Sequence, residues 1–479
     1  MSDLNPQVVA SSWLADYSAA FATQNLDALA GLFLPDGWLR DLLVFTWDTR
    51  SLEGREKIKA FLLPTLSGAQ VSDFKLDESA HLMPRTSDIL KFRRQTSIGA
   101  AQIGLQIAAR FKQMDLSALV IERTARVGDV WRNRYPSLAL HTPRKQHTLL
   151  YQPYPDNWPV YTPRDKVANW LEQYASVQDL VVWTSAELQP CPKYDEATRE
   201  WDVTVIREGK EYKLRPVHII MATGTLGAPN VPRVSGADVF KGRLCHSVEY
   251  NGPEEFTGKR VVVIGAGNTA IDICQDLALT GVREVTMVQR SSTCVMARDF
   301  MTEIIKHVFP EGVPMPVSDL RNAALPYGLL KKLNIRAQAY MWQAQKELYD
   351  KLRQDKGGAD LIAEGRIKVK HGVEIDHLAE NSVVFTDGSE LPADIVVLAT
   401  GYLNMKDTNR ALLGEDIIDK TGELYGLDDE GELRSSYRPS GQPGLWYATG
   451  DFFHGRFMSK ILGMQIKARQ LGLVKPDQS

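Results

Sequence analysis

The stretch KRVVVIGAGNTAIDICQDLA, residues 259–278, decides the fold of this chain. A short apolar run at 261–264 has the pattern of a strand buried on both faces. Residues 265–270 form a glycine turn, and a helical pattern continues from 271 to 279. Strand, turn and helix in this order predict a dinucleotide-binding unit of a doubly wound α/β fold.

Each residue of the turn has a separate task. Gly265 makes the tight turn, and Gly267 lets the backbone approach a pyrophosphate. Ala270 is small enough for close packing of the helix on the strand. Asn268 and Thr269 begin the helix, whose N–H donors and dipole favour phosphate. We expect all five residues to contact the cofactor.

The end of the next strand, EVTMV at 284–288, indicates which nicotinamide cofactor binds. A site selective for NAD would carry an acid there for the ribose hydroxyls, but this sequence continues with Gln289 and Arg290. A guanidinium at this point suits a 2′-phosphate, which favours NADPH over NADH. The alternative is that Arg290 is only a solvated surface residue.

A second, less regular turn lies in FRRQTSIGAAQIGLQIAARF, residues 92–111. Gly99 and Gly104 keep the outer glycine positions and lead into a helix. Glu122 follows the strand ALVI, where an acid accepts hydrogen bonds from an adenosine ribose. Ala101 replaces the middle glycine, and we expect its methyl group to weaken pyrophosphate binding.

The segment in front of this second turn does not have the apolar pattern of a buried strand. The preceding residues, DILKFRRQTS, place Lys91, Arg93 and Arg94 where a central buried strand belongs. Burying unpaired charge is very costly. We therefore expect the strand to be missing or irregular. The cofactor would then be held weakly or not at all.

Beyond residue 99, helical patterns alternate with short apolar runs, which predicts parallel sheets in a doubly wound α/β fold with two such units. The expected strands are 118–122, 216–224, 261–265, 284–288 and 393–401.

The first 70 residues have a different, α+β pattern. Apolar spacing over 6–34 predicts two short helices split near Asn25. A strand is expected at 41–49, followed by a turn and a helix at 51–66.

Three strands end in similar turn sequences. Ala222-Thr223-Gly224 and Ala399-Thr400-Gly401 each follow an apolar strand, as expected where the chain turns back across a dinucleotide site. In GLWYATGDF, residues 444–452, the strand ends at Gly450 and Asp451. Asp451 could accept hydrogen bonds from the ribityl hydroxyls of a flavin, cap a helix, or do both.

Composition sets limits on the function. With 24% charged residues and a net charge of −3, the chain has no basic block for nucleic acid. We see no secretory signal and no apolar run near the ~20 residues of a membrane span. The four scattered cysteines indicate a reducing compartment, the cytoplasm, and contain no C-x-x-C pair of a disulfide reductase. No metal-ligand spacing is visible.

The segment FKGRLCHSVEY, residues 240–250, matches F-x-G-x-x-x-H-x-x-x-Y through Phe240, Gly242, His246 and Tyr250. It resembles the fingerprint of flavin-containing monooxygenases. The two turns and the sequence LATGY are similar to that family as well, and the resemblance covers roughly residues 97–475.

The resemblance implies a domain arrangement and a set of site residues. It places an FAD-binding domain at 88–236 and 380–479, with an NADPH-binding domain, 237–379, inserted in it. His246 would be catalytic, or the fingerprint would couple the two domains. The cofactor-binding set is Gly99, Gly104, Glu122, Trp131, Gly450 and Asp451 for FAD, and Gly265, Gly267, Asn268, Thr269, Ala270 and Arg290 for NADPH. Thr400 and Gly401 complete the set, at a point where the chain turns back across a dinucleotide site.

The resemblance also implies a reaction, with a place in secondary metabolism. NADPH reduces FAD, dioxygen adds to give a flavin 4a-hydroperoxide, and one oxygen atom passes to a small organic substrate. Tyr402 favours the N- or S-oxygenating or plant auxin-type branch over the Baeyer–Villiger branch. A Baeyer–Villiger enzyme and a flavin-free NADP(H)-binding pseudo-enzyme remain alternatives. The oligomeric state is left open.

The first 75 residues resemble the start of a SnoaL-like cone, which gives an N-terminal segment at 1–80. Three segments are shorter in this sequence than in the family pattern. They are the second half of the cone at 70–95, the first flavin strand, and the region near 355. Several missing blocks indicate a spliced or misassembled gene, or a degenerate copy.

Overall fold

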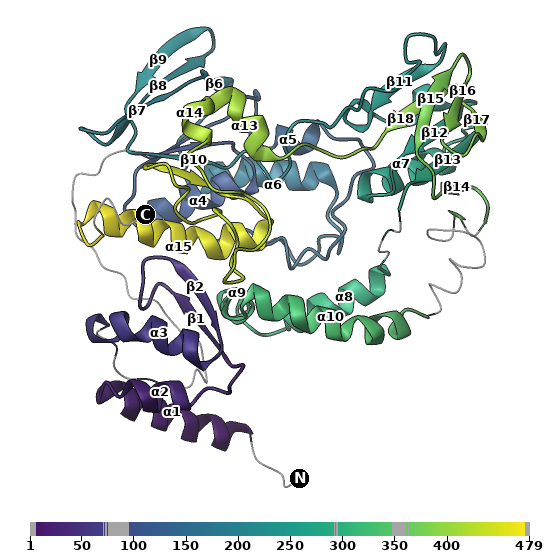
Figure 1. Cartoon of the computed structure of the whole chain (residues 1–479). Helices are drawn as coiled ribbons and strands as arrows, with labels where there is room; N and C mark the ends of the chain where they lie inside the picture. Colours follow the sequence, from purple (N-terminus) through teal and green to yellow (C-terminus); the bar gives the residue numbers. More distant parts are fainter. Residues whose placement is uncertain are drawn as a thin grey trace.

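The computed structural model describes residues 6–69, 71, 74, 95–291, 293, 296–346, 361–362 and 364–474. Figure 1 shows two parallel sheets, one at the left and one at the right of the view, with the N-terminal segment below the first. The expected fold class, two dinucleotide-binding α/β units with a small α+β segment, is confirmed.

The first sheet is parallel and has five strands. Helices α4 (Gln102–Gln113) and α15 (Phe452–Gln470) pack against each other beside it, and most side chains of both helices are buried. The strand order is β19 (Leu445–Tyr447), β10 (His218–Met221), β3 (Gln95–Ile98), β4 (Ala118–Ile121) and β5 (Val182–Trp183).

Strand β3 contradicts the expectation that the first strand is missing. It lies at the centre of the sheet, in register with β10 on one side and β4 on the other. Its side chains are mostly polar, yet Gln95, Thr96 and Ser97 are all buried. Pairing on both edges satisfies the backbone, so a strand of four residues persists without an apolar sequence. Lys91, Arg93 and Arg94 precede it and lie outside the described residues.

The second sheet is also parallel and five-stranded. Helix α7 (Asn268–Leu279) packs on it. Its order is β11 (Arg243–His246), β18 (Ile395–Leu398), β12 (Arg260–Ile264), β13 (Glu284–Gln289) and β14 (Lys368–His371). Because β18 pairs with β11 and β12, residues 395–398 belong to this sheet and lie beyond the boundary expected at 380.

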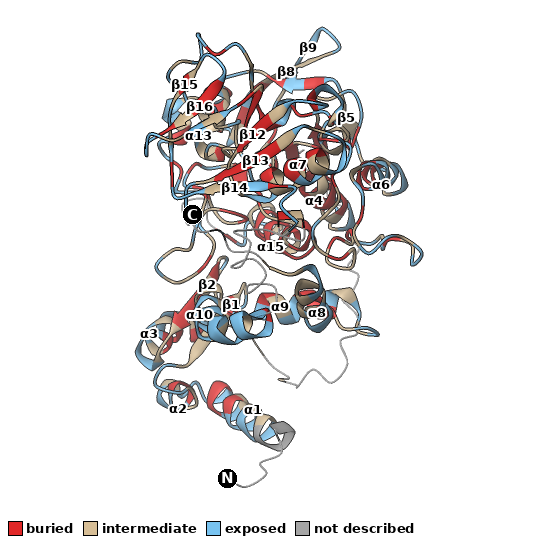
Figure 2. Cartoon of the chain, turned by 90° about the vertical axis from the view of Figure 1, so that its right-hand side faces the viewer, coloured by how far each residue is buried: buried red, intermediate tan, exposed pale blue. Residues whose placement is uncertain are grey.

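Two antiparallel sheets and several helices complete this part of the chain. One sheet holds β15 (Ile375–Ala379), β16 (Ser382–Phe385) and β17 (Glu390–Pro392), and the other holds β6 (Ala186–Leu188), β7 (Lys193–Asp195), β8 (Glu200–Arg207) and β9 (Lys210–Leu214). The helices are α5 (Asp129–Arg132), α6 (Arg164–Val177), α8 (Arg298–Val308), α9 (Met315–Ala324), α10 (Tyr327–Ala344), α13 (Met405–Leu413) and α14 (Glu415–Ile418), with 3₁₀ turns η2 (Ser247–Glu249) and η3 (Glu254–Phe256). Figure 2 shows burial concentrated in the sheets and α15, whereas α10 has no buried residue.

The N-terminal unit, residues 6–69, has its own apolar core. It consists of α1 (Pro6–Ala22), α2 (Leu26–Gly31), β1 (Trp38–Leu42), β2 (Thr49–Glu53), α3 (Arg55–Thr65) and the 3₁₀ turn η1 (Leu66–Gly68). The expected split near Asn25 is confirmed, because its side chain caps α2 by accepting the N–H of Ala28 at 3.0 Å. The strand expected at 41–49 is wrong: residues 43–48 connect two antiparallel strands. The buried carboxylate of Asp41 accepts three N–H groups of this connection.

A buried ion pair joins the N-terminal unit to the rest of the chain. Arg40 and Glu432 lie 2.7 Å apart, and their side chains are only 4% and 1% exposed. Arg40 also donates to the carbonyl groups of Ala323 and Leu325, at the end of α9. Arg438 adds a second bridge, because it contacts Asp48 of the unit at 2.7 Å. Charged contacts therefore fix the position of this unit.

We expect Glu432→Gln to lower the free energy of unfolding by about 3 kcal/mol, because it leaves the Arg40 guanidinium buried without a counter-charge. Chemical denaturation measures this loss. The control is Asp27→Asn, which breaks the solvent-exposed pair with Lys59 in the same unit and should change nothing measurable. Equal losses of unfolding free energy in the two variants would contradict the buried contact between Arg40 and Glu432.

Candidate cofactor-binding site

The two glycine turns begin with the same close contact. Gly99 and Gly265 have positive φ angles of 103° and 127°. A Cβ at Gly99 would lie 2.6 Å from the carbonyl oxygen of Ala222, and one at Gly265 would lie 2.3 Å from that of Ala399. Glycine is therefore required at both positions by backbone conformation and by space.

These contacts explain the repeated Ala-Thr-Gly sequence. Each alanine follows the strand beside a glycine turn, β10 in the first sheet and β18 in the second. The second copy is fixed further by Asn230, whose N–H donates to the carbonyl of Gly401 at 2.9 Å. The hydroxyl of Thr400 donates to the carbonyl of Asn230 at 2.6 Å. The structure thus places Thr400 and Gly401 beside the second turn.

The middle residues of the two turns share the same backbone conformation. Ala101 has φ −88° and ψ −173°, and Gly267 has φ −82° and ψ 179°. Both are extended, so Ala101 adopts its conformation without strain. At this position the first turn differs from the second by one methyl group, not by its backbone conformation. Gly104 is strictly needed, since a Cβ there would lie 1.9 Å from the Gly99 carbonyl oxygen.

The helix ends behind both turns suit phosphate. Neither α4 nor α7 has a side-chain cap or an acidic residue in its first turn. Asn268, at the start of α7, is exposed beside Gly267, and Thr269 is half-buried, whereas Ala270 is fully buried against the sheet. The N–H groups at these helix starts are therefore positioned for an anionic ligand.

Glu122 stands where the sequence predicts it, directly after β4. Its Oε2 accepts the N–H of Ala100 at 2.8 Å, inside the first turn. Its Oε1 accepts the N–H of Thr124 at 2.9 Å and the Thr124 hydroxyl at 2.8 Å. The carboxylate thereby ties the end of the strand to the glycine turn.

Trp131 lies on α5 and packs against the apolar cores of both parallel sheets. Its ring centre is 6.5 Å from that of Phe452, at the start of α15. The indole Nε1 is buried and has no hydrogen-bond partner within the described part of the chain. A buried N–H without a partner is costly, so this donor suits a bound ligand.

Gly450 and Asp451 connect β19 to α15. The Asp451 carboxylate accepts the N–H of His454 at 3.1 Å, which confirms the helix cap. Burial raises the pKa of Asp451, but hydrogen bonds from the His454 ring at 2.8 Å and from Gln146 at 3.2 Å outweigh burial and hold it well below its usual range. Asp451 is therefore an anion that accepts hydrogen bonds.

His147 is a neighbour of this carboxylate that sequence reasoning missed. Its ring lies 5.1 Å from that of Phe452, and its Nε2 hydrogen-bonds with the Thr142 hydroxyl at 2.6 Å. Burial lowers the pKa of His147 to about 4, so the ring is neutral at neutral pH. No motif around His147 in the sequence indicated that it lies beside this carboxylate.

The fingerprint residues form a packed coupling between strands. Phe240 and Tyr250 are buried, and a Cβ at Gly242 would lie 2.5 Å from the Asp394 carbonyl oxygen. His246 Nδ1 accepts the N–H of Val248 at 3.3 Å, and its Nε2 faces the Gly401 carbonyl at 3.3 Å.

This pattern requires the proton of His246 on Nε2. Burial lowers the pKa of the ring, which keeps it neutral, and the ring lies 5.9 Å from that of Tyr402. Both ring nitrogens are engaged with backbone groups. The geometry favours the coupling role over the catalytic role.

Two carboxylates of α7 were also missed. Asp272 accepts the Tyr135 hydroxyl at 2.6 Å and faces His141 Nε2 at 3.0 Å. Asp276 accepts the Tyr250 hydroxyl at 2.8 Å, and the Ser137 hydroxyl at 2.9 Å. Their spacing of four residues on one helix face was the available signal. The pair holds the segment after Trp131 against the second sheet.

Arg290 follows β13, as expected, and its side chain is 75% exposed. Its guanidinium lies 3.5 Å from the carboxylate of Glu374. The side chain is thus accessible beside the second turn.

Two further observations concern the chain as a whole. No helix among the described residues is both long and apolar enough to cross a membrane. Cys245 and Cys274 are buried and Cys191 is exposed, all three as free thiols, while Cys294 lies outside the described residues.

Comparisons with known proteins agree with this geometry. The family model of flavin-binding monooxygenase-like proteins matches residues 93–409. An indole-3-pyruvate monooxygenase of Oryza sativa subsp. japonica, YUCCA1, is 31% identical over 64% of this chain and 75% of its own length. YUCCA8 of Oryza sativa subsp. indica is 30% identical over 75% of this chain and 86% of its own length.

Solved structures show the same fold. A flavin-containing monooxygenase from Stenotrophomonas maltophilia has a TM-score of 0.56 at 20% identity, covering 80% of this chain and 100% of that one. A cyclohexanone monooxygenase has a TM-score of 0.57 at 17% identity, covering 80% and 89%.

The family model spans more than half of the 479 residues and leaves the N-terminal unit outside. The resemblance of that unit to a SnoaL-like cone therefore stays a prediction. The expected enzyme class, an NADPH-dependent flavin monooxygenase with FAD and NADPH as cofactors, is confirmed. The chain belongs to the flavin-binding monooxygenase-like family.

Proposed function

We propose that this chain inserts one oxygen atom from dioxygen into a small organic substrate, by N- or S-oxygenation or a related reaction, with FAD and NADPH as cofactors. The observation that carries the proposal is the pair of matching turns, in which Gly99 and Gly265 each pack on an alanine carbonyl at the end of a parallel strand. Ligands of α/β sheets bind at such carboxyl ends.

The first turn and its neighbours would hold FAD. The N–H groups at the start of α4, behind Gly99 and Gly104, would bind the pyrophosphate, and Glu122 the adenosine ribose. Asp451 would accept hydrogen bonds from ribityl hydroxyls, since its low pKa keeps it an acceptor, and Trp131 would offer its indole N–H. When bound, the flavin supplies the redox and oxygen chemistry, and the protein supplies position and shielding.

The second turn would hold NADPH. The helix start at Gly267, Asn268 and Thr269 would bind the pyrophosphate, and Arg290 the 2′-phosphate. We assign this role to residues 237–379 together with β18, and the FAD-binding role to 88–236 and the remaining C-terminal part.

The contacts between the two units would keep the cofactors aligned. His246, on β11, binds the carbonyl of Gly401, and Asp272 and Asp276 hold the segment that follows Trp131. Transfer of hydride needs the two reacting atoms close together and correctly oriented. We therefore assign His246, Asp272 and Asp276 a positioning role.

The relatives and the residue Tyr402 bear on the substrate. Two of the relatives are named indole-3-pyruvate monooxygenases, which supports the auxin-type or N- and S-oxygenating branch. The cyclohexanone monooxygenase neighbour keeps the Baeyer–Villiger reaction as the second candidate. Assays with a thioether, a tertiary amine, indole-3-pyruvate and a cyclic ketone separate these, because only the Baeyer–Villiger reaction converts the ketone to a lactone.

The flavin-free alternative loses its main support, because β3 is formed and paired on both edges. Ala101 in the first turn is the only remaining observation in favour of a flavin-free protein. We place the enzyme in the cytoplasm, consistent with the few and scattered cysteines.

Purified protein should show the visible absorption bands of oxidised flavin, and NADPH added without air should bleach them, because NADPH bound at the second turn would reduce FAD bound at the first. Admission of air should restore the bands and consume NADPH. Protein that stays colourless after incubation with FAD would refute the proposed function.

Exchange of the middle residues tests the two turns separately. Ala101→Gly should tighten FAD binding, because it removes the methyl group that faces the pyrophosphate. Gly267→Ala should weaken NADPH binding by about 1–3 kcal/mol through the same crowding. It should leave stability unchanged, since the added Cβ would meet nothing within 4 Å and φ is extended.

Calorimetric titration of each cofactor measures the effect of the exchange. Each variant serves as the control for the other site. If Gly267→Ala altered FAD binding but not NADPH binding, the assignment of the turns would be reversed.

Arg290→Ala should weaken NADPH binding by about 1–3 kcal/mol and leave NADH binding nearly unchanged, because only the 2′-phosphate contacts the guanidinium. Glu374→Gln should have the opposite effect on NADPH, since it removes the carboxylate that competes for Arg290. Arg283→Ala, before the other end of β13, is the matched control. Equal losses with both nicotinamide cofactors would contradict the 2′-phosphate contact.

A further inference from the structure

Arg456, on α15, is a buried arginine outside the expected cofactor-binding set. Its side chain is only 2% exposed, and that of its counter-charge, Asp319 on α9, is 6% exposed. The Nε of Arg456 donates to one carboxylate oxygen at 2.9 Å, and Nη2 donates to the other at 2.8 Å. A paired contact of this kind fixes the plane of the guanidinium as well as its place. The ion pair therefore joins α9 to α15 in a defined geometry.

The remaining nitrogen of Arg456 binds a segment of the main chain. Its Nη1 donates to the carbonyl groups of Gln146 and Thr148, each at 2.7 Å. The residues that follow are bound by Gln106 of α4, whose Oε1 accepts the N–H of Leu150 at 2.9 Å. The backbone of this segment is thus fixed to both helices that pack beside the first sheet.

The same segment carries the side chain that contacts the proposed flavin carboxylate. Gln146 Nε2 donates to Oδ2 of Asp451 at 3.2 Å. The other oxygen, Oδ1, accepts the backbone N–H of His454 at 3.1 Å and faces its ring nitrogen at 2.8 Å. Within the described part of the chain, Gln146 is the single donor to Oδ2, and a carboxylate oxygen accepts about two hydrogen bonds. Because the Asp451 side chain is 43% exposed, Oδ2 is the oxygen that a ligand hydroxyl can still use.

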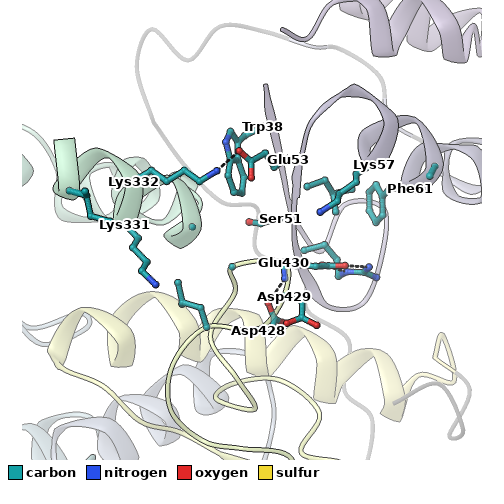
Figure 3. A pocket seen from close by; sticks show the side chains of 17 residues that line it. Trp38, Ser51, Glu53, Lys57, Phe61, Lys331, Lys332, Asp428, Asp429 and Glu430 are labelled. Atoms are coloured by element: carbon teal, nitrogen blue, oxygen red, sulfur yellow. Dashed lines mark hydrogen bonds and ion pairs between the residues drawn. The ribbon is translucent and has the colours of Figure 1, made fainter. Parts of the chain in front are cut away.

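The helix that carries Asp319 is itself held from the other side. Arg40 of the N-terminal unit donates to two carbonyl groups at the end of α9. The next helix, α10, is joined to β2 through the ion pair of Lys332 with Glu53 (Figure 3). A shift of α9 would break these contacts. Asp319 is therefore a fixed counter-charge for the guanidinium.

We propose that Arg456 and Asp319 are positioning residues for the flavin, because they hold Gln146 where its amide orients Oδ2 of Asp451 for a ribityl hydroxyl. The inference rests on the proposed function, in which Asp451 accepts hydrogen bonds from that part of FAD. With its backbone fixed, Gln146 stays within reach of the carboxylate before the flavin binds. A contact that is already in place costs less ordering on binding, which raises the affinity.

Equilibrium titration of the FAD-free full chain with FAD tests the proposal. Gln146→Leu should lower the affinity about fivefold, since it removes the donor to Asp451. Arg456→Lys should have a similar effect, because one ammonium group cannot bind both oxygens of Asp319 and two carbonyl groups in the same geometry. The double variant should also lose about fivefold, because both changes act through one contact, whereas independent effects would multiply to about 25-fold.

Chemical denaturation of the same FAD-free variants separates positioning from stability. Gln146→Leu should leave the denaturation midpoint unchanged, and Arg456→Lys should lower it equally with and without the Gln146 change. Asp319→Asn, which leaves Arg456 buried without its counter-charge, should lower both the midpoint and the affinity for FAD. The affinity for NADPH should stay the same in every variant, which a general loss of structure would not allow.

The neighbouring residue Lys145 provides the matched control. Its Nζ donates to the carbonyl of Pro310 at 2.8 Å, so it also joins the segment to the chain that leads into α9. None of its hydrogen bonds within the described ranges involves Asp451. Lys145→Met should therefore change the affinity for FAD by less than about twofold.

The proposal is overturned if Gln146→Leu binds FAD as tightly as the wild type, or if the double variant loses the product of the two single effects. Either result, with tight FAD binding by the wild type, would leave the proposed function intact. Wild-type protein that binds no FAD would refute the proposed function and the positioning role together.

Discussion

The structure depends on one steric constraint, the close approach of a glycine to the carbonyl group of an alanine on the neighbouring strand. It occurs twice, between Gly99 and Ala222 and between Gly265 and Ala399. Any side chain at either glycine would push the strands apart. Because the contact fixes where each turn leaves its sheet, it also fixes the direction of the helix start behind it. The two places where we propose that pyrophosphates bind follow from this one geometric condition.

Two such sites make an oxygenase only if they are held in register with each other. The contacts to which we assign this role are polar and lie where different elements meet. His246 binds the turn after β18 through Gly401, and the carboxylates of α7 hold the chain that follows Trp131. Trp131 itself packs on both cores. Phe240, His246 and Tyr250 of the family fingerprint are buried, which supports the positioning role that we propose for this segment.

The N-terminal unit is joined to this framework by charge. The Arg40–Glu432 pair is buried, and its two residues lie on opposite sides of the contact. Such a pair gives a defined geometry, because either charge alone in that place would be very unfavourable. The same contact brings β2, α10 and the loop 427–431 close together.

The sequence by itself determined the two turns, the acid after β4, the family and most strands of the parallel sheets, because these are set by local patterns of glycine and apolar residues. It did not find β3, since Gln95, Thr96 and Ser97 are buried through pairing with β10 and β4, which no local pattern shows. The connection at 43–48 was hidden in the same way, because it depends on the buried carboxylate of Asp41. Only the tertiary structure decided the partners of Asp272, Asp276 and Arg40, since each contact joins residues that are far apart in the chain.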